Sequence, residues 1–531
     1  MAILDPETDD SSAEERHRTP TRLWQTRIRD HLVIVSLYLT LFLAALDVTI
    51  VAPALPIIAS HLNATTAQYT WVGSAYTLAS TSTTPLWAKV SDIWGRKTIL
   101  MATNAVFLCG SLICALSVSP MMLIGGRVVQ GIGGGGIIVM VTIIIGDLFT
   151  LRERAKYYAL TGIVWAIASG VGPILGGVFT QTIGWEWCFY INLPFDGLSL
   201  ILLFFFMHLK PTSAPVTTLR TFDFGGCILV ISGTVCFLYG LESGSGSHGW
   251  SSEQTLGLLL GGLALLTLFT LYEWRVAKEP ILPLRHLLTR ATIPCLLTAT
   301  FHSITFIPYT YFNPLYFQSI LHISPIKSGV YLFALVLPLS AMTLASGLYV
   351  KRTGSYRPII WVAGAVMVTG TALFIDFDRH LELEKIVLYQ LVAGLGAGPL
   401  FQAPMIAYQS CLEPKMVAPG NAALTFLKNL GTSLSLVLGG VVVQGVDGGL
   451  LTGGYGEGME GSTSGTGGQQ ENEESFMRGL KAMWIFYTGT CAVMWLASFG
   501  IVRRDLDSKA EPAGDPEGST PTDKVGGSEE K

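Results

Sequence analysis

Long apolar runs, separated by short polar segments, recur along the whole chain. Each run has about the 20 mostly apolar residues that a helix needs to cross the hydrocarbon core of a bilayer. Fourteen such runs can be read, so the pattern predicts an all-α integral membrane protein with fourteen transmembrane helices. The runs lie near 32–57, 69–88, 98–119, 122–148, 155–180, 187–209, 222–241, 255–274, 292–318, 328–350, 358–376, 386–410, 416–445 and 480–502.

Three polar segments are longer than the others. Residues 1–31 precede the first run and residues 504–531 follow the last, and both segments read as cytosolic tails, the second of them disordered. Residues 446–478 are rich in Gly, Ser and Glu, a composition typical of disordered, solvated loops. The first segment lacks the cationic start and short apolar stretch of a cleaved signal peptide. We therefore expect the first run to act as an uncleaved membrane anchor.

The distribution of basic residues orients the runs. Of the 33 Lys and Arg residues, 26 fall in segments on one side of the membrane, five on the other side and two inside runs. Cytosolic loops of membrane proteins carry the excess of Lys and Arg. An even number of spans with this asymmetry places both termini in the cytosol, and the loop 446–478 on the outer or lumenal side.

Composition supports the membrane assignment and excludes other classes. Hydrophobic residues make up 50% of the chain and charged residues 13%, with a mean hydropathy of +0.50, whereas soluble domains have about 25% charged residues. A net charge of −4 gives no indication of nucleic-acid binding. The eight cysteines lie in or beside apolar runs without metal-like spacing, so they read as small buried hydrophobes. We expect neither a metal nor an organic cofactor.

No segment predicts an enzyme or an ATP-driven pump. The glycine-rich stretch 131–136 lies inside an apolar run, without the preceding strand and the following Lys-Ser/Thr of a phosphate-binding loop.

Ionisable side chains inside the runs point to function, because each costs a few kcal/mol in hydrocarbon. Asp47 and Arg127 both fall in the outer half of the membrane, given a rise of about 1.5 Å per residue. Asp47 is the one acidic residue that stands clearly within a run. We predict that Asp47 and Arg127 meet in a central cavity, where the carboxylate exchanges a proton. The alternative is a static ion pair that holds two helices together.

Other polar side chains within the runs are candidates for a substrate cavity. Each of them alone is equally well explained by ordinary hydrogen bonding between helices, and the aromatic ones by anchoring at the membrane interface. The candidates are Gln130, His302, Tyr309, Asn313, Gln402, Asn421 and Lys428.

Five short motifs occur in order along the first 210 residues. They are Leu46–Val51 with Ala54–Pro56, the loop Ala88–Lys97, Arg127–Gly131, Gly172–Gly177 and Trp185–Pro194. Together they resemble the major facilitator superfamily, specifically its fourteen-span drug:proton antiporter branch found in fungi. Two positions depart from that branch: Ala88 stands where glycine is usual, and Glu186 where arginine is usual.

The resemblance implies two six-helix bundles, residues 32–210 and 292–503, with two additional transmembrane helices within 211–291. It also implies alternating access, in which the bundles rock around a central substrate site. Asp47 and Arg127 would serve proton coupling. The resemblance also implies a cytosolic gate and an antiporter motif. The gate residues would be Asp92, Gly95, Arg96 and Lys97, and the antiporter motif Gly172, Pro173, Gly176 and Gly177. A basic loop that merely fixes topology is the alternative to the gate. Gly347, Lys351, Gly354 and Arg357 form a weak second copy of the gate loop.

The leading functional hypothesis is a monomeric exporter of drugs, toxins or secondary metabolites that is driven by the proton gradient. A vacuolar transporter of basic amino acids is the second hypothesis, and a non-transporting nutrient sensor the third, disfavoured by short tails. The membrane is accordingly the plasma membrane or, alternatively, that of the vacuole. Asn63-Ala64-Thr65 is a glycosylation sequon on the outer side.

Overall fold

The computed structural model describes residues 20–51, 54–64, 66–207, 222–245, 249–323, 325–378, 383–446, 466–504 and 506. Most of both predicted tails, and residues 447–465 of the predicted outer loop, lie outside the described residues. Helices make up nearly all of the described chain, which contains no β-strand in these ranges.

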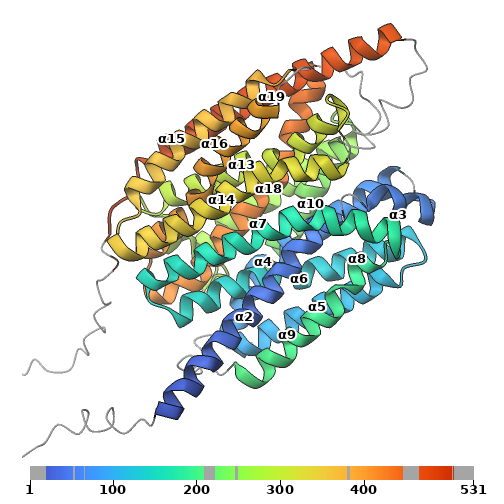
Figure 1. Cartoon of the computed structure of the whole chain (residues 1–531). Helices are drawn as coiled ribbons and strands as arrows, with labels where there is room; N and C mark the ends of the chain where they lie inside the picture. The colour runs from blue at the N-terminus through green and yellow to red at the C-terminus, as the bar shows by residue number, and fades with distance from the viewer. Residues whose placement is uncertain are drawn as a thin grey trace, which may run out of the picture.

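The first half of the chain forms a bundle of long helices. Its members are α2 (Pro20–Ile50), α4 (Thr66–Trp94), α5 (Arg96–Ala115), α6 (Pro120–Leu148), α7 (Leu151–Thr182) and the pair α8 (Trp187–Tyr190) and α9 (Asn192–Phe206). A short helix, α3 (Leu55–Leu62), follows α2. Within this N-terminal bundle α6 packs against α4 and α5, and α2 packs against α7 and α9 (Figure 1).

The second half forms a similar bundle. Its helices are α13 (Ile293–Ser319), α14 (Pro325–Thr353), α15 (Arg357–Leu373) with η1 (Phe374–Asp376), α16 (Leu383–Leu400), α17 (Ala403–Ser410), η2 (Pro414–Met416), α18 (Val417–Val446) and α19 (Thr466–Ser498). The predicted span 386–410 is interrupted between α16 and α17, because Pro399 and Pro404 each remove a backbone donor. Gln402 lies in this break.

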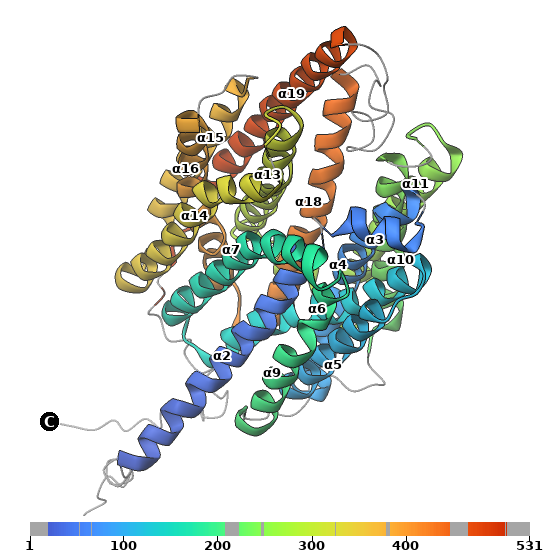
Figure 2. The same cartoon turned by 45° about the vertical axis from the view of Figure 1, so that its right-hand side comes forward.

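Two further helices connect the bundles, α10 (Phe224–Ser245) and α11 (Glu253–Arg275), followed by the single turn α12 (Leu284–Leu287). Helix α10 packs along α11 on one side and against α4 and α18 on the other. Figure 2 shows α10 and α11 at the edge of the molecule, beside the N-terminal bundle.

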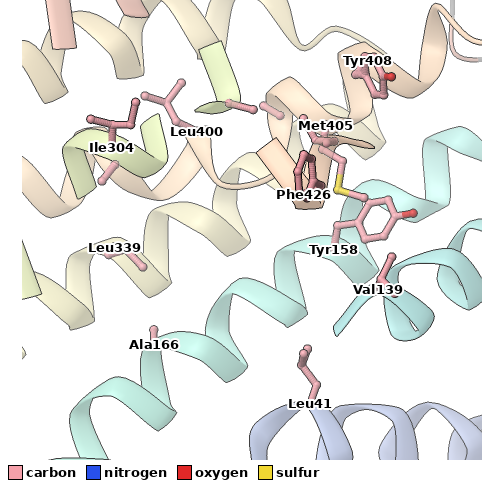
Figure 3. Packing of buried hydrophobic residues seen from close by; sticks show 14 of the residues in the cluster. Leu41, Val139, Tyr158, Ala166, Ile304, Leu339, Leu400, Met405, Tyr408 and Phe426 are labelled. Atoms are coloured by element: carbon pink, nitrogen blue, oxygen red, sulfur yellow. The ribbon is translucent and has the colours of Figure 1, made fainter. Parts of the chain in front are cut away.

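The two bundles meet along a continuous seam. Helix α7 packs against α14, and α18 packs against α4 and α6; both views show α7 alongside α14 (Figures 1 and 2). A single cluster of buried apolar side chains runs through both bundles. Figure 3 shows Tyr158 of α7 beside Met405 of α17 at this seam. The first turns of α2 and α19 lie at opposite ends of the bundles (Figure 1).

Twelve of the described helices or helix pairs are long and apolar enough to cross a membrane. The other two predicted spans are also continuous helices, α4 with 29 residues and α13 with 27. Their hydropathy is lower because Ser, Thr, Tyr, Asn and His side chains occupy faces that are buried against neighbouring helices. The predicted count of fourteen therefore stays a prediction.

Three predicted boundaries differ from the structure. The first run was expected to reach residue 57, but α2 ends at Ile50 and α3 begins separately. Residues 466–478, expected to be disordered, form the start of α19, since their Glu and Gln residues are good helix formers that extend the following span. Residues 20–31, expected to belong to a polar tail, form the first turns of α2.

Candidate functional site

An ion pair is buried in the middle of the N-terminal bundle. The guanidinium of Arg127 on α6 donates to the carboxylate of Asp47 on α2, and the two side chains are 2% and 0% exposed. Gln130, one turn after Arg127, accepts from Arg127 Nη1 at 2.7 Å and donates to Asp47 Oδ1 at 2.7 Å. The structure thus brings Asp47 and Arg127 together as expected, and places Gln130 between them as a third member of the network.

Two more helices complete the network. Asn192 of α9 donates to Asp47 Oδ1 at 3.3 Å and to Ser111 Oγ of α5 at 3.1 Å, and Gln130 donates to the same hydroxyl at 2.8 Å. All of these side chains are buried. The predicted site omitted Asn192, although it lies in the Trp185–Pro194 motif, and Ser111, which no pattern distinguishes from other polar residues in apolar runs.

A close approach of helices holds Arg127 in place. Arg127 Nε donates to the carbonyl of Val72 on α4 at 3.2 Å, and its guanidinium carbon lies 4.6 Å from the ring centroid of Tyr76. A Cβ on Gly131 would lie 2.3 Å from the Tyr76 carbonyl oxygen. Only glycine therefore allows α4 and α6 to approach closely enough for these contacts.

The contacts between Asp47 and Arg127 depend on the charge of the carboxyl. Asp47 is ionised in the geometry described, since it accepts from Arg127, Gln130 and Asn192. Protonation of the carboxyl would remove the charge attraction to Arg127 and free the guanidinium to move. The structure describes the paired state. A neutral carboxyl would have different contacts, and such a difference is what coupling a proton to a conformational change requires.

The predicted gate residues form a second polar cluster at the opposite end of α6. Arg96, which begins α5, pairs with Asp92 at 2.6 Å and with Asp147 of α6 at 3.1 Å, and it also donates to Ser91 Oγ. Gly95 has φ of +86°, a conformation that favours glycine, and turns the chain between α4 and α5. Lys97 Nζ donates to the carbonyl of Phe204 at 2.7 Å.

The gate cluster lies within the N-terminal bundle, and its acidic member Asp147 was not predicted. In the second bundle Gly354, which also has a positive φ of +66°, occupies the corresponding loop.

The bundles are joined near this cluster by Arg152 at the start of α7. Its Nε donates to the carbonyl of Lys351 at 2.6 Å and its Nη2 to that of Arg352 at 2.8 Å. Both carbonyls belong to the last turn of α14, where four carbonyls have no partner within the helix. A cation at the negative end of a helix dipole is stabilising. Arg152 therefore fastens one bundle to the C-terminal end of a helix in the other.

We predict that Arg152→Ala weakens this closed seam by about 1.5–3 kcal/mol, the scale of hydrogen bonds to charged groups. Closure of the seam can be measured by disulfide formation between Thr161→Cys and Gln402→Cys, in a chain whose eight native cysteines are replaced. These two side chains face each other across the seam, with Gln402 Nε2 donating to Thr161 Oγ1 at 2.9 Å. Cross-linking should fall in Arg152→Ala and stay unchanged in Lys156→Ala, whose ammonium lies over the neighbouring Tyr157 ring on the same helix. Equal cross-linking in the two variants would contradict the role of Arg152.

Two predicted cavity residues lie in the seam. They are Gln402, described above, and Asn421 of α18. The side-chain oxygen of Asn421 accepts from Gln409 Nε2 at 2.8 Å, and Gln409 also donates to Tyr158 Oη of α7 at 3.0 Å. These hydrogen bonds make Gln402 and Asn421 part of the contact between bundles in the state that the structure describes.

His302 and Lys428 share an aromatic environment. The ammonium of Lys428 lies 5.7 Å from the ring centroid of Phe401, and the His302 ring lies 4.7 Å from the same ring and 6.0 Å from that of Phe306. His302 Nε2 contacts the Ala397 carbonyl at 3.2 Å, and no described residue bonds its buried Nδ1. The two candidates are thus brought together around Phe401.

Tyr309 and Asn313 lie inside the second bundle and not at the seam. Tyr309 is hydrogen-bonded to Thr371 and packs against Phe374 and Trp484, so it belongs to an aromatic core. Asn313 is fully buried on the same helix, and neither polar atom of its amide has a partner among the described residues. In the state described, the ring of Tyr309 packs α13 against η1 and α19, and its role in a cavity stays a prediction.

The predicted antiporter motif lies in α7 around Pro173. Gly172 faces α2, where a Cβ would meet Thr49 Oγ1 at 2.1 Å, whereas Gly177 has open space. Gly176 is buried. The motif therefore contains one glycine required by helix contact. Asn63 is exposed at the end of α3 with φ of +52°.

The expectation that Asp47 is the one clear acidic residue within a run is wrong. Asp196 of α9 is 0% exposed, and neither of its carboxylate oxygens has a partner in the described part of the chain. Asp196 stands near the middle of the predicted run 187–209, so the sequence already indicated that it lies within the membrane.

Comparisons with known proteins agree on the family. The model of the Major Facilitator Superfamily matches residues 37–436. The chain is 45% identical over 414 residues to the efflux pump dotC of Dothistroma septosporum, covering 78% of this chain and 71% of the pump. It is 36% identical to the efflux pump FUS6 of Gibberella moniliformis, covering 79% and 73% of the two chains.

A solved structure supports the fold alone. The human organic anion transporter MFSD10 superposes with a TM-score of 0.56 at 16% identity, covering 88% of this chain and 99% of that one.

Proposed function

The chain belongs to the Major Facilitator Superfamily and is a multi-pass membrane transporter of small molecules, and on this premise we propose that it exports organic compounds in exchange for protons. The substrates proposed are drugs, toxins or secondary metabolites. The efflux pumps among its relatives support the direction of transport. We further propose the fourteen-span antiporter architecture, with α10 and α11 as the two additional spans between the bundles, and a monomer with cytosolic termini in the plasma membrane.

The buried network of Asp47, Arg127 and Gln130 carries the proposal of proton coupling. A pair of opposite charges withdrawn from water is not an efficient way to stabilise a protein, since desolvation offsets much of the attraction. The pair sits beside α7, the helix that also forms the seam to the second bundle, because α2 packs against α7. A change in the charge of Asp47 can therefore reach the contact between the bundles.

Alternating access would use the seam as its gate on the cytosolic side. In the state described, the α7–α14 contact and the Arg152 hydrogen bonds hold the cytosolic ends of the bundles together. The Asp92–Arg96–Asp147 cluster fixes the loop between α4 and α5 next to them. Export requires this seam to open so that substrate can enter from the cytosol.

Lys428 is proposed to contact substrate, together with Phe401 and His302. Lys428 belongs to α18, which packs against the N-terminal bundle as well, and its ammonium lies over the ring of Phe401. Both observations support this role. We predict that Lys428→Gln shifts the preference from anionic toward cationic dyes by about tenfold, equivalent to about 1.4 kcal/mol. Relative export rates of an anionic and a cationic dye measure the shift. Lys385→Gln, an exposed lysine of α16, is the control; a preference unchanged in both variants would remove Lys428 from the substrate site.

The function as a whole is tested by dye retention in cells. Cells that express the chain should retain less of at least one dye from an amphipathic panel than control cells, and a protonophore should abolish the difference. Export that persists with the protonophore argues against proton coupling. A fluorescent fusion tests the membrane: signal at the cell rim supports efflux, and signal at the vacuole supports the alternative of vacuolar uptake. Glycosylation at Asn63 is proposed as well, and an unchanged gel mobility after glycosidase treatment would refute it.

A further inference from the structure

The buried face of α9 carries an unusual sequence of polar side chains. Its buried residues are Asn192, Asp196, Ser199 and Leu203, which share one face of the helix. Asn192 bonds Asp47 of α2 and Ser111 of α5, and Ser199 Oγ donates to the Ser36 carbonyl of α2 at 2.9 Å. Asp196 lies between these two anchored positions, so it faces the contact of α9 with α2 and α5.

Among the side chains that the structure describes, no cation pairs with the carboxylate of Asp196. The residues on α2 at this level are Thr40 and Ser36, both fully buried, and α5 contributes the buried Asn104. The titratable or charged groups with described side chains on the helices packed against α9 come from three helices. They are His31, Tyr38 and Asp47 on α2, Cys188 and Tyr190 on α8, and Arg96, Lys97, Cys109 and Cys114 on α5. Arg96 is held by Asp92 and Asp147, and Lys97 by the Phe204 carbonyl.

Substrate has no route to this carboxyl. Helix α9 packs against α2, α5 and α8, all within the N-terminal bundle, and Asp196 is 0% exposed. An ionised carboxylate that is buried without a hydrogen-bond donor or a cation is strongly unfavourable. The neutral acid avoids the cost of burying a charge, and it has an O–H group that can donate. A proton is the one ligand that fits the site.

We propose that Asp196 is a second proton-binding carboxyl, which passes protons between Asp47 and the cytosolic side of the N-terminal bundle. This inference rests on the proposed proton coupling. Asp196 lies about 6 Å along α9 from Asn192, on the cytosolic side of it. When Arg127 pairs again with Asp47, the proton that leaves Asp47 is taken up by Asp196. The proton that Asp196 held before is released toward the cytosolic side of the bundle.

The described state corresponds to one step of this relay. Asp47 is bound to Arg127 and ionised, and the proton resides on Asp196. The relay conserves charge, because each carboxyl gives up one proton for each that it receives. It also explains why a carboxyl is present at a depth where packing alone would favour an apolar residue.

Infrared difference spectroscopy of the purified full chain in lipid tests proton binding without any substrate. The wild type should show the C=O stretch of a buried carboxylic acid. Asp196→Asn should remove this band, Asp196→Glu should shift it, and Asp47→Asn should retain it. Asp376→Asn, which removes a carboxylate that accepts from Tyr389 outside this bundle, should leave the band unchanged. A band that Asp196→Asn does not alter overturns the proposal.

Transport tests the relay itself. In liposomes, proton movement driven by a gradient of an exported dye should fall at least about tenfold in Asp196→Asn, while exchange of dye for dye continues. Normal proton movement in this variant overturns the relay, whatever the spectrum shows. If the wild type moves dye without protons, the proposed coupling fails, and the infrared result still decides whether Asp196 binds a proton.

Discussion

Asp47→Asn is expected to reduce proton-driven export by about 100-fold or more, the scale on which loss of a positioned proton carrier acts. The amide has the size of the carboxyl, and its one oxygen can accept either from Arg127 or from Gln130 and Asn192, while its NH2 group faces a donor at the other position. It has no ionised form, and Arg127 can no longer be held and released by a change of charge. Dye export at matched expression measures the effect.

The single variant alone does not separate coupling from stability. It leaves the Arg127 charge buried without its ion partner, a defect that costs about 3–5 kcal/mol when a buried pair is broken. The double variant Asp47→Asn, Arg127→Gln removes both charges and keeps hydrogen-bonding groups at both positions. Thermal unfolding in detergent should return toward the wild-type value in the double variant, whereas export should stay absent. Export restored together with stability would show that the pair is structural.

Gly347→Val is expected to prevent closure of the seam between α7 and α14. A Cβ on Gly347 of α14 would lie 2.5 Å from Ala159 Cβ and 2.6 Å from the Ala155 carbonyl oxygen, both on α7. Overpacking of this kind costs about 1–3 kcal/mol, and such a bias changes the ratio of closed to open states by about 5-fold to 150-fold. Export should fall because the outward-facing state that releases substrate is depopulated.

Gly329→Val is a matched control on the same helix, because a Cβ at Gly329 would have no neighbour within 4 Å. Both substitutions replace a helical glycine by the same residue, so their effects on helix propensity are alike. The disulfide between Thr161→Cys and Gln402→Cys should form in the Gly329→Val background and be lost in the Gly347→Val background. Equal cross-linking in both would show that the α7–α14 contact opens without steric constraint from Gly347.

The sequence predicted those features that depend on hydrophobicity along the chain. Helices, their approximate positions and the pairing of Asp47 with Arg127 follow from apolar runs and from the cost of isolated charges within them. Helix ends were less predictable. The start of α19 at Thr466 lies in a segment whose composition indicates a loop, yet a helix already formed in the membrane extends into it.

Partners from other helices could not be predicted, because they depend on how the helices rotate about their axes. Asp147 reads as the last polar residue of a span, and only the packing of α5 on α6 places it against Arg96. Tyr309 and Gln402 look equally suited to a cavity in the sequence. Packing directs Tyr309 into the aromatic core of the second bundle and Gln402 into the seam.

Proton movement driven by dye in liposomes is the most direct test of the central claim. Purified chain is reconstituted with a pH probe inside, and an exported dye is added outside. The account predicts that the lumen becomes alkaline as dye enters and protons leave, and that the double variant Asp47→Asn, Arg127→Gln shows no such change. Dye entry without a pH change in the wild type, or the same pH change in the double variant, would contradict it.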